Sequence, residues 1–228
     1  RQTSVSVLVL IPARGGSKSV PRKNIYELGG KPLIQYSIKT ALDIPRACRT
    51  IVSTDDQEIA DVAQNYGAEV PFIRPHTLAQ DDTLGIAPVI HALEQFPEVE
   101  QVLLLQPTSP LRTTADIDGI VKMCQEAQAT AAVSICETSK HPNWMFSFGN
   151  DRHLSTFTGN PIVSRRQDLP KVYTLNGALY LAKTDWIQQN RSFLSPETLG
   201  YVMPPERSAD IDTLLDWEWV ELLMSKKL

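Results

Sequence analysis

The sequence predicts an α/β fold with three layers, in which helices cover both faces of a mostly parallel sheet. Short apolar runs alternate along the chain with segments whose apolar side chains recur at helical spacing. Strands that alternate with helices in this way usually pair in parallel and are buried on both faces. With 228 residues, of which 42% are hydrophobic, the chain is long enough for a sizeable core. We therefore expect a single domain over residues 1–228.

The apolar runs give the expected strands, and the periodic segments give the expected helices. Strands are expected at residues 5–11, 50–54, 101–105, 131–136 and 176–182, with an edge strand at 199–203. Helices are expected at residues 33–42, 55–66, 86–96, 116–127, 183–190 and 214–223. Pro32 suits the first position of the first helix, and Asp55 with Asp56 is expected to cap the second.

The first strand runs into a polar loop, residues 11–24, which holds two glycines, two serines and four basic residues. Glycine lets the backbone approach a ligand closely, and successive N–H groups in such a turn bind anions. Arg14, Lys18, Arg22 and Lys23 add cationic donors that suit phosphate oxygens. The loop therefore favours a polyanion, most simply the triphosphate of a nucleotide, over the alternative of a solvated basic loop.

This basic loop matches neither of the common nucleotide-binding signatures. Gly15, Gly16 and Lys18 lack the spacing of a P-loop, and the glycine pattern of dinucleotide-binding proteins is absent. The sequence therefore argues against a P-loop ATPase and against a nicotinamide-dependent dehydrogenase.

Composition narrows the partners further. A formal net charge of −4 argues against nucleic acid. Since no apolar run reaches the length of a membrane span, no membrane partner is expected. Cys48, Cys124 and Cys136 lie far apart, which favours buried reduced thiols over disulfides or zinc. We expect a cytoplasmic protein, or a nuclear one if a segment before Arg1 carries a signal.

A stiff polar turn follows the strand at residues 101–105. Ligands of open α/β sheets gather at the carboxyl ends of strands. Two prolines can hold Gln106, Thr108 and Ser109 outward, and amide and hydroxyl groups suit a polyol. The alternative is a rigid turn that leads to a helix capped at Thr114.

A pair of carboxylates precedes the last helix. Asp210 and Asp212 are two residues apart, so an extended segment presents both on one face. Mg²⁺ prefers one or two carboxylates together with phosphate oxygens. The alternative is that Asp212 caps the last helix, and Asp216 is a weaker candidate beyond it.

The chain changes character between residues 137 and 170, which are polar, rich in turns and partly alternating. This segment is expected to form an appended β-hairpin. Trp144, Phe146 and Phe148, if exposed, would fit an interface, although a locally folded hairpin needs no partner.

Taken together, these motifs resemble the CMP-sialic acid synthetases, which are cytidylyltransferases that activate nonulosonic acids. The resemblance spans nearly the whole chain. It implies a Rossmann-like nucleotidyltransferase fold in which the insertion at about 137–170 makes a homodimer and reaches into the partner's site. The matching segments are Pro12-Ala-Arg-Gly-Gly-Ser-Lys18, Pro21-Arg-Lys-Asn24, Gln106-Pro-Thr-Ser-Pro-Leu-Arg112, Arg165-Arg-Gln-Asp-Leu-Pro170, Asn176-Gly-Ala-Leu-Tyr180 and Asp210-Ile-Asp212.

The resemblance also implies roles for individual residues, with CTP and a nine-carbon 2-keto sugar acid as substrates. Asp210 and Asp212 would bind Mg²⁺, and Lys18, Arg14 and Asp212 would be catalytic. The implied nucleotide-binding residues are Arg14, Gly15, Gly16, Ser17, Lys18, Lys23, Asn24 and Thr83. The implied sugar-binding residues are Gln106, Thr108, Ser109, Arg165, Arg166, Gln167, Asn176 and Tyr180.

Several of these roles have a plainer alternative. Thr83 or Asp82 would cap the helix at 86–96, and Asn176 with Gly177 would form a bulge in a strand. Trp144 and Thr174 stand where the family can carry basic residues, which indicates a less conventional sugar such as a legionaminic acid. Two rival functions remain at this point: a Kdo or other sugar nucleotidyltransferase, and a non-catalytic nucleotide-binding module.

Overall fold

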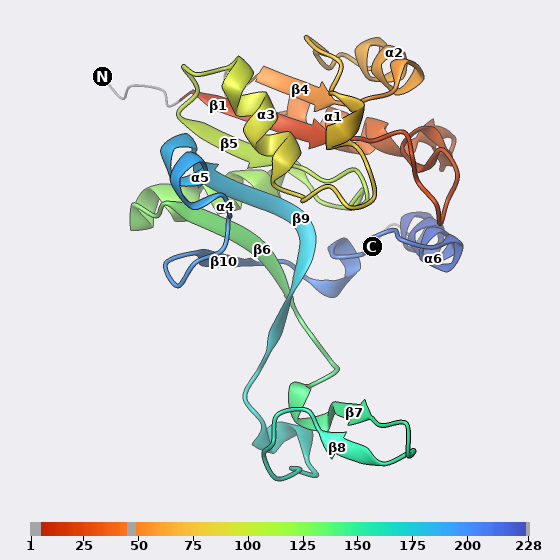
Figure 1. The fold of residues 1–228 in the computed structure, drawn as a ribbon, viewed down its shortest axis with the longest axis vertical. Helices are drawn as coiled ribbons and strands as arrows, with labels where there is room; N and C mark the ends of the chain where they lie inside the picture. Colours follow the sequence, from red (N-terminus) through yellow and green to blue (C-terminus); the bar gives the residue numbers. More distant parts are fainter. Residues whose placement is uncertain (1–5, 45–48, 227–228) are drawn as a thin grey trace.

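The computed structural model, which describes residues 6–44 and 49–226, has a central six-stranded sheet between two layers of helices (Figure 1). The strand order is β10-β6-β9-β5-β1-β4. Within this sheet, as far as the structure describes it, β9 runs antiparallel to its neighbours β5 and β6. The other strand pairs of the sheet are parallel. The predicted three-layer α/β fold with a mostly parallel sheet is therefore confirmed.

The helices and strands agree closely with the expected segments. The sheet consists of β1 (Val7–Pro12), β4 (Arg49–Ser53), β5 (Gln101–Leu104), β6 (Ala131–Glu137), β9 (Tyr173–Lys183) and β10 (Leu199–Val202). The short hairpins are β2 (Glu27–Leu28) with β3 (Lys31–Pro32), and β7 (Phe146–Phe148) with β8 (Leu154–Thr156). The helices are α1 (Leu33–Leu42), α2 (Gln57–Asn65), α3 (Ala87–Gln95), α4 (Thr114–Ala127), α5 (Thr184–Asn190) and α6 (Leu214–Ser225).

Successive side chains of β1 point to opposite faces of the sheet, and their contacts show which helices cover each face. Val9 and Ile11 pack into one core cluster with residues of α1, α2 and α4. Leu8 and Leu10 point the other way and pack with residues of α3 and α5. Because both faces of the strand are covered, its sequence reads as an almost unbroken apolar run.

A third, smaller core cluster attaches α6 to the basic loop. Val20, from the middle of that loop, is fully buried with Ile211, Trp217 and Val220. Other apolar residues of α6 are exposed, namely Leu214, Leu215, Trp219 and Leu222. Thus the loop is not wholly a surface element, because one valine anchors it against the last helix.

Several expected helix ends are wrong by a residue or two. Asp56 caps α2 by accepting a hydrogen bond from Ile59 N at 3.0 Å, as expected, but Asp55 does not cap it. The capping residue of α4 is Thr113 rather than Thr114. Pro32 precedes the first helical residue, and Leu42 at the end of the α1 stripe is exposed.

Two of the alternative capping roles are also wrong. Ile86 stands at the N-cap of α3, so neither Asp82 nor Thr83 caps that helix. Thr213 caps α6 in a reciprocal pair with Asp216, so Asp212 is not the cap. The Asp212 carboxylate is therefore not committed to helix capping.

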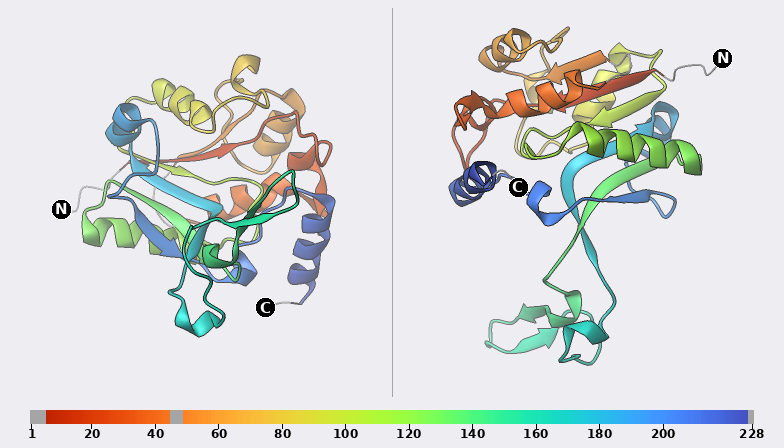
Figure 2. Two further views of the ribbon diagram at one scale, coloured as in Figure 1. Left: turned by 60° about the horizontal axis from the view of Figure 1, so that its bottom comes forward. Right: turned by 180° about the vertical axis from the view of Figure 1, so that it is seen from behind.

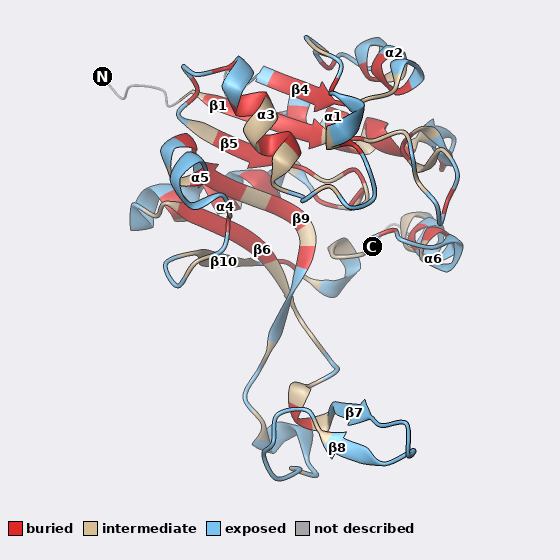
Figure 3. Cartoon of the chain, in the orientation of Figure 1, coloured by how far each residue is buried: buried red, intermediate tan, exposed pale blue. Residues whose placement is uncertain are grey.

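The segment between β6 and β9 projects away from the sheet as a small lobe (Figures 1 and 2). The two long strands cross as they leave the body, and the β7–β8 hairpin lies at the far end. The predicted β-hairpin is therefore confirmed. Figure 3 shows that this lobe, which includes Phe146 and Phe148, is mostly exposed, whereas the strands of the body are buried.

The cysteine prediction holds in part. Cys124 is buried and unpaired, whereas Cys136 is unpaired but only half-buried. Val5 and Cys48 lie outside the described residues. No helix in the described ranges has the length and apolar character to cross a membrane.

Candidate active site

A pocket of about 280 Å³ opens where β1 and β5 end, which is the edge at which ligands of open sheets bind. One wall comes from the basic loop and carries Arg14, Lys23 and Asn24. Another comes from the turn after β5, with Gln106 and Thr108. The segment between β4 and α3 closes it with Arg74, Gln80, Asp81 and Thr83.

A second cavity of about 550 Å³ adjoins the first and shares Arg14 and Asp81 with it. Gly16, Ser17 and Lys18 line this cavity, so the basic loop borders both spaces. Most of the predicted nucleotide-binding residues therefore lie around one continuous region.

Arg14 and Lys18 both form an ion pair with Asp81 on the opposite wall. Arg14 Nη1 and Lys18 Nζ each lie 2.6 Å from a different oxygen of that carboxylate. The bond from Lys18, followed by that from Arg14, lowers the pKa of Asp81 below its usual range. Two cations held side by side in this way can bind a phosphate group as readily as a carboxylate.

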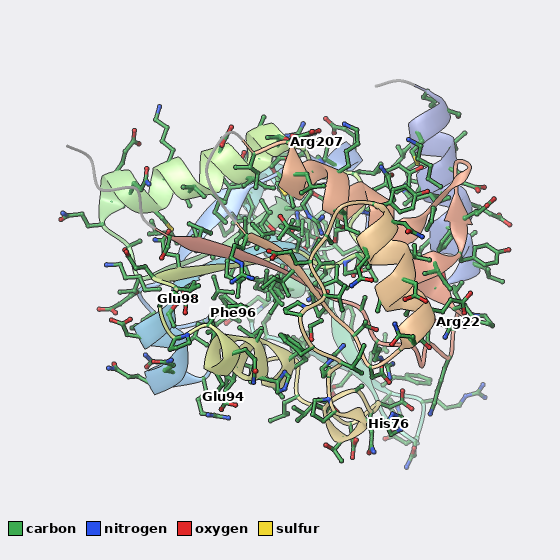
Figure 4. All side chains as sticks on the ribbon, turned by 90° about the horizontal axis from the view of Figure 1, so that it is seen from above. Arg22, His76, Glu94, Phe96, Glu98 and Arg207 are labelled. Atoms are coloured by element: carbon green, nitrogen blue, oxygen red, sulfur yellow. The ribbon has the colours of Figure 1, made fainter. Side chains whose placement is uncertain are left out.

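Arg22, one of the four cations of the basic loop, is engaged by acidic residues of α2 and its N-cap. Its guanidinium turns to α2, where it lies 2.7 Å from both Asp56 Oδ2 and Glu58 Oε2 (Figure 4). The hydrogen bond from Arg22 lowers the pKa of Asp56 to about 2. Arg22 thus holds the loop to α2 through these ion pairs, and its backbone is left-handed (φ 55°).

Gly15 and Asn24 brace the loop. The Gly15 N–H donates to Asp55 Oδ1 at 2.9 Å, and a Cβ on Gly15 would lie 2.9 Å from Asp56 Oδ2. Asn24 is buried and donates to the carbonyl of Arg14 at 3.0 Å. In this conformation the Asp55 carboxylate occupies the Gly15 donor, so the role of Gly15 in nucleotide binding stays a prediction.

Lys23 joins the basic loop to the carboxylate pair. Its ammonium donates to the carbonyl of Ile211 at 3.2 Å, between Asp210 and Asp212. Crowding by protein atoms removes water from the Asp210 carboxylate and raises its pKa, and the charges of Asp212 and Asp216 raise it further. A hydroxyl bond from Thr108 and the charge of Lys23 oppose that rise only in part.

The predicted sugar-binding turn faces Gly177 and Asp210. A Cβ on Gly177, whose φ is +73°, would lie 3.7 Å from Gln106 Oε1 and 3.8 Å from both Ser109 Oγ and Asp210 Oδ2. Ser109 is fully buried, and its hydroxyl has no hydrogen-bond partner among the described residues. A buried hydroxyl without a partner is an exception in folded proteins, and this one lies close to Gln106 and Asp210 around Gly177.

The side chain of Asn176 is engaged by protein groups. Its side chain binds the Ser134 hydroxyl, accepts from Ala178 N at 3.2 Å and donates to Ser208 Oγ at 3.1 Å. The pairing of β6 with β9 shifts register at this level, between Val133 and Ile135. The alternative of a strand bulge is therefore confirmed, and Asn176 holds the bulge.

Tyr180 also belongs to the core rather than to the pocket. Its ring packs on Phe193 with centroids 5.4 Å apart, and burial raises its pKa, with a smaller contribution from Asp210. It does not line either cavity of the site.

Arg165, Arg166 and Gln167 are not brought to this pocket by the chain that carries them. They lie in the projecting lobe, where Arg165 Nε pairs with Asp168 at 2.9 Å. Arg166 and Gln167 line a separate cavity of about 380 Å³ with Glu137 and His141. Trp144 is also in the lobe, where its indole donates to the carbonyl of Val163 at 2.6 Å, and Thr174 is on the exposed part of β9.

Sequence reasoning missed a buried arginine beneath the pocket. Arg112 donates to the Ala178 carbonyl and to Ser37 Oγ, both at 2.8 Å, and to the Gln106 carbonyl. Burial lowers its pKa to about 9. The sequence places Arg112 at the end of the Gln106 turn, but nothing in the sequence indicates that its side chain points inward.

Arg74 was missed as well. It lines the pocket, is 4% exposed, and donates to the carbonyls of Ser53 and Leu78. Its Nε has no partner in the part of the chain that the structure describes. The sequence around Arg74 does not indicate that this side chain is buried at the pocket. Only the fold brings residues 53, 74 and 78 together.

An ion pair fixes the segment that carries the carboxylates. Arg207 grips the buried Asp116 of α4 at 2.8 and 3.0 Å, and Tyr201 donates to the same carboxylate at 3.2 Å (Figure 4). Although burial opposes it, the bonds from Arg207 and Thr113 lower the pKa of Asp116. Within residues 6–44 and 49–226, no group of three or more metal-ligating side chains is present, so Asp210 and Asp212 stand as a pair.

The three-layer fold, with its basic loop after β1 and polar turn after β5, is of the Rossmann-like nucleotidyltransferase type. Among solved structures, the chain is similar to CMP:2-keto-3-deoxy-manno-octonic acid synthetase complexed with CTP (TM-score 0.73, 19% identity, 98% of this chain and 100% of that one). It is also similar to 4-diphosphocytidyl-2C-methyl-D-erythritol synthase from Anaerococcus prevotii (TM-score 0.69, 11% identity, 98% of this chain and 100% of that one). At these identities the likeness concerns the fold.

The family model for cytidylyltransferases matches residues 8–195, and the chain belongs to this family. It is 38% identical to CMP-N,N'-diacetyllegionaminic acid synthase of Legionella pneumophila, with 96% of each chain covered. It is 34% identical to pseudaminic acid cytidylyltransferase of Campylobacter jejuni, with 95% of each covered. It is 31% identical to N-acylneuraminate cytidylyltransferase of Escherichia coli, over 97% of this chain but 52% of that longer protein.

Proposed function

We propose that this protein transfers a cytidylyl group from CTP to the anomeric hydroxyl of a nonulosonic acid and releases pyrophosphate. The observation that carries the proposal is one cleft with paired cations, Arg14 and Lys18, on one side and the Gln106 turn on the other. Asp210 lies next to that turn, where the Thr108 hydroxyl binds it. The named relatives, which act on legionaminic, pseudaminic and sialic acids, support the same reaction class.

The chemistry is an in-line displacement at the α-phosphorus. The anomeric oxygen forms the new bond to phosphorus, the bond between the α-phosphorus and the bridging oxygen breaks, and pyrophosphate leaves with that electron pair. Arg14 and Lys18 would hold the phosphates and offset the charge that grows on the leaving group. The hydroxyl proton would pass to one of the two carboxylates, Asp210 or Asp212.

Asp210 and Asp212 are also the residues that would hold Mg²⁺. The pKa of Asp210 is raised partly by neighbouring carboxylates, so the pair is short of positive charge. Since Thr213 rather than Asp212 caps α6, both carboxylates remain available to a cation. A bound Mg²⁺ supplies charge neutralisation at the phosphates and polarises the reacting oxygen.

Legionaminic acid is the sugar we propose. The relative that acts on the diacetylated form matches over 96% of both chains at 38% identity. Trp144 and Thr174 give a second reason, because they stand where the family can carry basic residues and so indicate a less conventional sugar. The predicted location remains the cytoplasm, because the cysteines are expected to be reduced thiols and the proposed substrate is CTP.

We also propose that two copies form the working enzyme. The lobe exposes the apolar side chains Phe148, Leu154, Phe157 and Ile162 by 53% to 70%, which a single chain leaves uncovered. Arg165 and Arg166 lie in the same lobe, outside the cleft of their own chain. A second copy would cover the apolar side chains and receive the arginines at its cleft.

Pyrophosphate release with CTP and Mg²⁺ tests the function. N,N'-diacetyllegionaminate, N-acetylneuraminate and Kdo are offered in parallel. We expect the first to give the highest kcat/KM and Kdo to give none above background. A preference for N-acetylneuraminate would correct the sugar while retaining the reaction, and no release with any nonulosonic acid from protein that binds CTP would refute it.

A further inference from the structure

Asp81 stands where the phosphates of the nucleotide are expected. Its two oxygens bridge Arg14 and Lys18 at 2.6 Å each, across the boundary between the two cavities. The carboxylate comes from the segment between β4 and α3, not from the basic loop itself. A carboxylate that bridges two cations reproduces the contacts of one phosphate group.

These ion pairs do little to stabilise the fold. The side chains of Lys18 and Asp81 are 83% and 46% exposed, and exposed ion pairs contribute little because water and salt screen them. Arg14 is also more than one-third exposed. The reason for an acidic residue at this position must therefore be sought in ligand binding.

No other acidic group contacts these two cations in the described part of the chain. Asp55 faces the loop but accepts from Gly15 N and lies 3.4 Å from His76 Nδ1. Asp82 is next to Asp81 in sequence yet forms no ion pair in the described ranges. The other cations of the loop are held elsewhere, Arg22 by α2 and Lys23 by the Ile211 carbonyl.

We propose that Asp81 is an affinity-setting residue that competes inside the site with the phosphates for Arg14 and Lys18. The inference rests on the proposed function. CTP binds by displacing the carboxylate, with contacts to the base and sugar adding to its affinity. After the reaction, pyrophosphate keeps only its contacts to the cations and metal, so the return of Asp81 favours its release.

Matched variants separate this role from a general charge effect. Asp81→Asn and Asp82→Asn remove the same charge from adjacent positions. Isothermal titration with inorganic pyrophosphate, with Mg²⁺ present, should show about fivefold tighter binding for D81N and less than about twofold for D82N, because only the first removes a contact charge. Added salt should reduce the difference in pyrophosphate affinity between D81N and D82N, because it screens the charges.

A kinetic readout follows the same direction. In the pyrophosphate-release reaction with saturating CTP, D81N should be inhibited at lower pyrophosphate concentrations than D82N and should lose kcat if product release is slow. Because Asp81 is half-exposed, thermal melting of the two variants should match.

Three results would overturn the inference. Weaker pyrophosphate binding by D81N would make Asp81 a contributor to binding, for instance through the accompanying metal. Equal effects of D81N and D82N would leave only long-range charge. Absence of pyrophosphate binding in every variant would refute both this inference and the proposed function. The expected pyrophosphate binding in D81N and D82N, without turnover of CTP and sugar, would refute the proposed function alone.

Discussion

At the scale of single residues, the site depends on which polar groups remain available once the chain has folded. Asp210 and Asp212 remain available, because Thr213 and Asp216 satisfy the start of α6 between themselves. Gly15, Arg22 and Asn176 do not, because Asp55, Asp56 and Ser134 respectively bind them. Residue type alone cannot distinguish these cases.

Asp212 and Asp216 lie close together at the start of α6, but their substitution should affect different properties of the protein. Asp212→Asn should raise the Mg²⁺ concentration for half-maximal activity by about tenfold, since a metal ligand is lost, while the melting temperature stays unchanged. Asp216→Asn should lower the melting temperature and leave the metal requirement nearly unaltered, because it weakens the cap. A normal Mg²⁺ titration in D212N would remove that residue from the metal site.

At the scale of elements, the segments that approach the cleft are held by contacts outside it. Arg112 joins the Gln106 turn, β9 and α1 through three hydrogen bonds, and Arg207 joins the Asp210 segment to α4. Arg22 does the same for the basic loop and α2. Such buried or half-buried anchors position the site because a planar guanidinium binds two or three acceptors at once.

The Arg22–Asp56 anchor gives a pH prediction. Because the folded-state pKa of Asp56 is depressed to about 2, below its ordinary value of about 3.9, its stabilisation is present above pH 4. It is lost as the pH falls through that window toward 2. Asp56→Asn keeps a good capping residue but removes the charge.

We therefore expect Asp56→Asn to be less stable than the natural protein at pH 6 and nearly equal to it at about pH 2. Thermal or urea unfolding across this range measures the difference. A constant difference at every pH would show that the ion pair contributes nothing. Asp61→Asn, on the exposed side of the same helix, is the control.

At the scale of the whole molecule, one chain is an incomplete enzyme under the proposed function. The lobe stands well away from the cleft of its own chain, with exposed aromatic residues at its tip (Figures 1 and 3). The sugar-binding arginines predicted from the sequence lie there. A homodimer in which each lobe serves the other chain accounts for both observations.

Mixing two inactive variants tests this arrangement. Lys18→Ala damages the cleft, and Arg166→Ala damages the lobe. If the lobe acts on the partner, mixed dimers contain one intact site of two, so an equal mixture should recover about a quarter of full activity after subunit exchange. If it acts on its own chain, no activity returns, and each variant incubated alone is the control.

Much of the architecture and part of the site could be predicted from the sequence. The apolar periodicity gave the layers and most element bounds, and the glycine- and cation-rich loop after β1 was correctly expected at the cleft. Arg74, Asp81 and Arg112 were missed as site residues. Each acts through neighbours distant in sequence, such as Asp81 with Arg14 or Arg112 with Ala178.

By itself, the sequence determined what depends on local order: strand and helix periods, the basic loop after β1 and the spacing of Asp210 and Asp212. Only the tertiary structure decided the antiparallel direction of β9, the bulge at Asn176 and the projection of the lobe. It also decided which cations have partners. The physical reason is competition, since each polar group binds the best neighbour that folding brings within about 3 Å, and sequence distance does not reveal that neighbour.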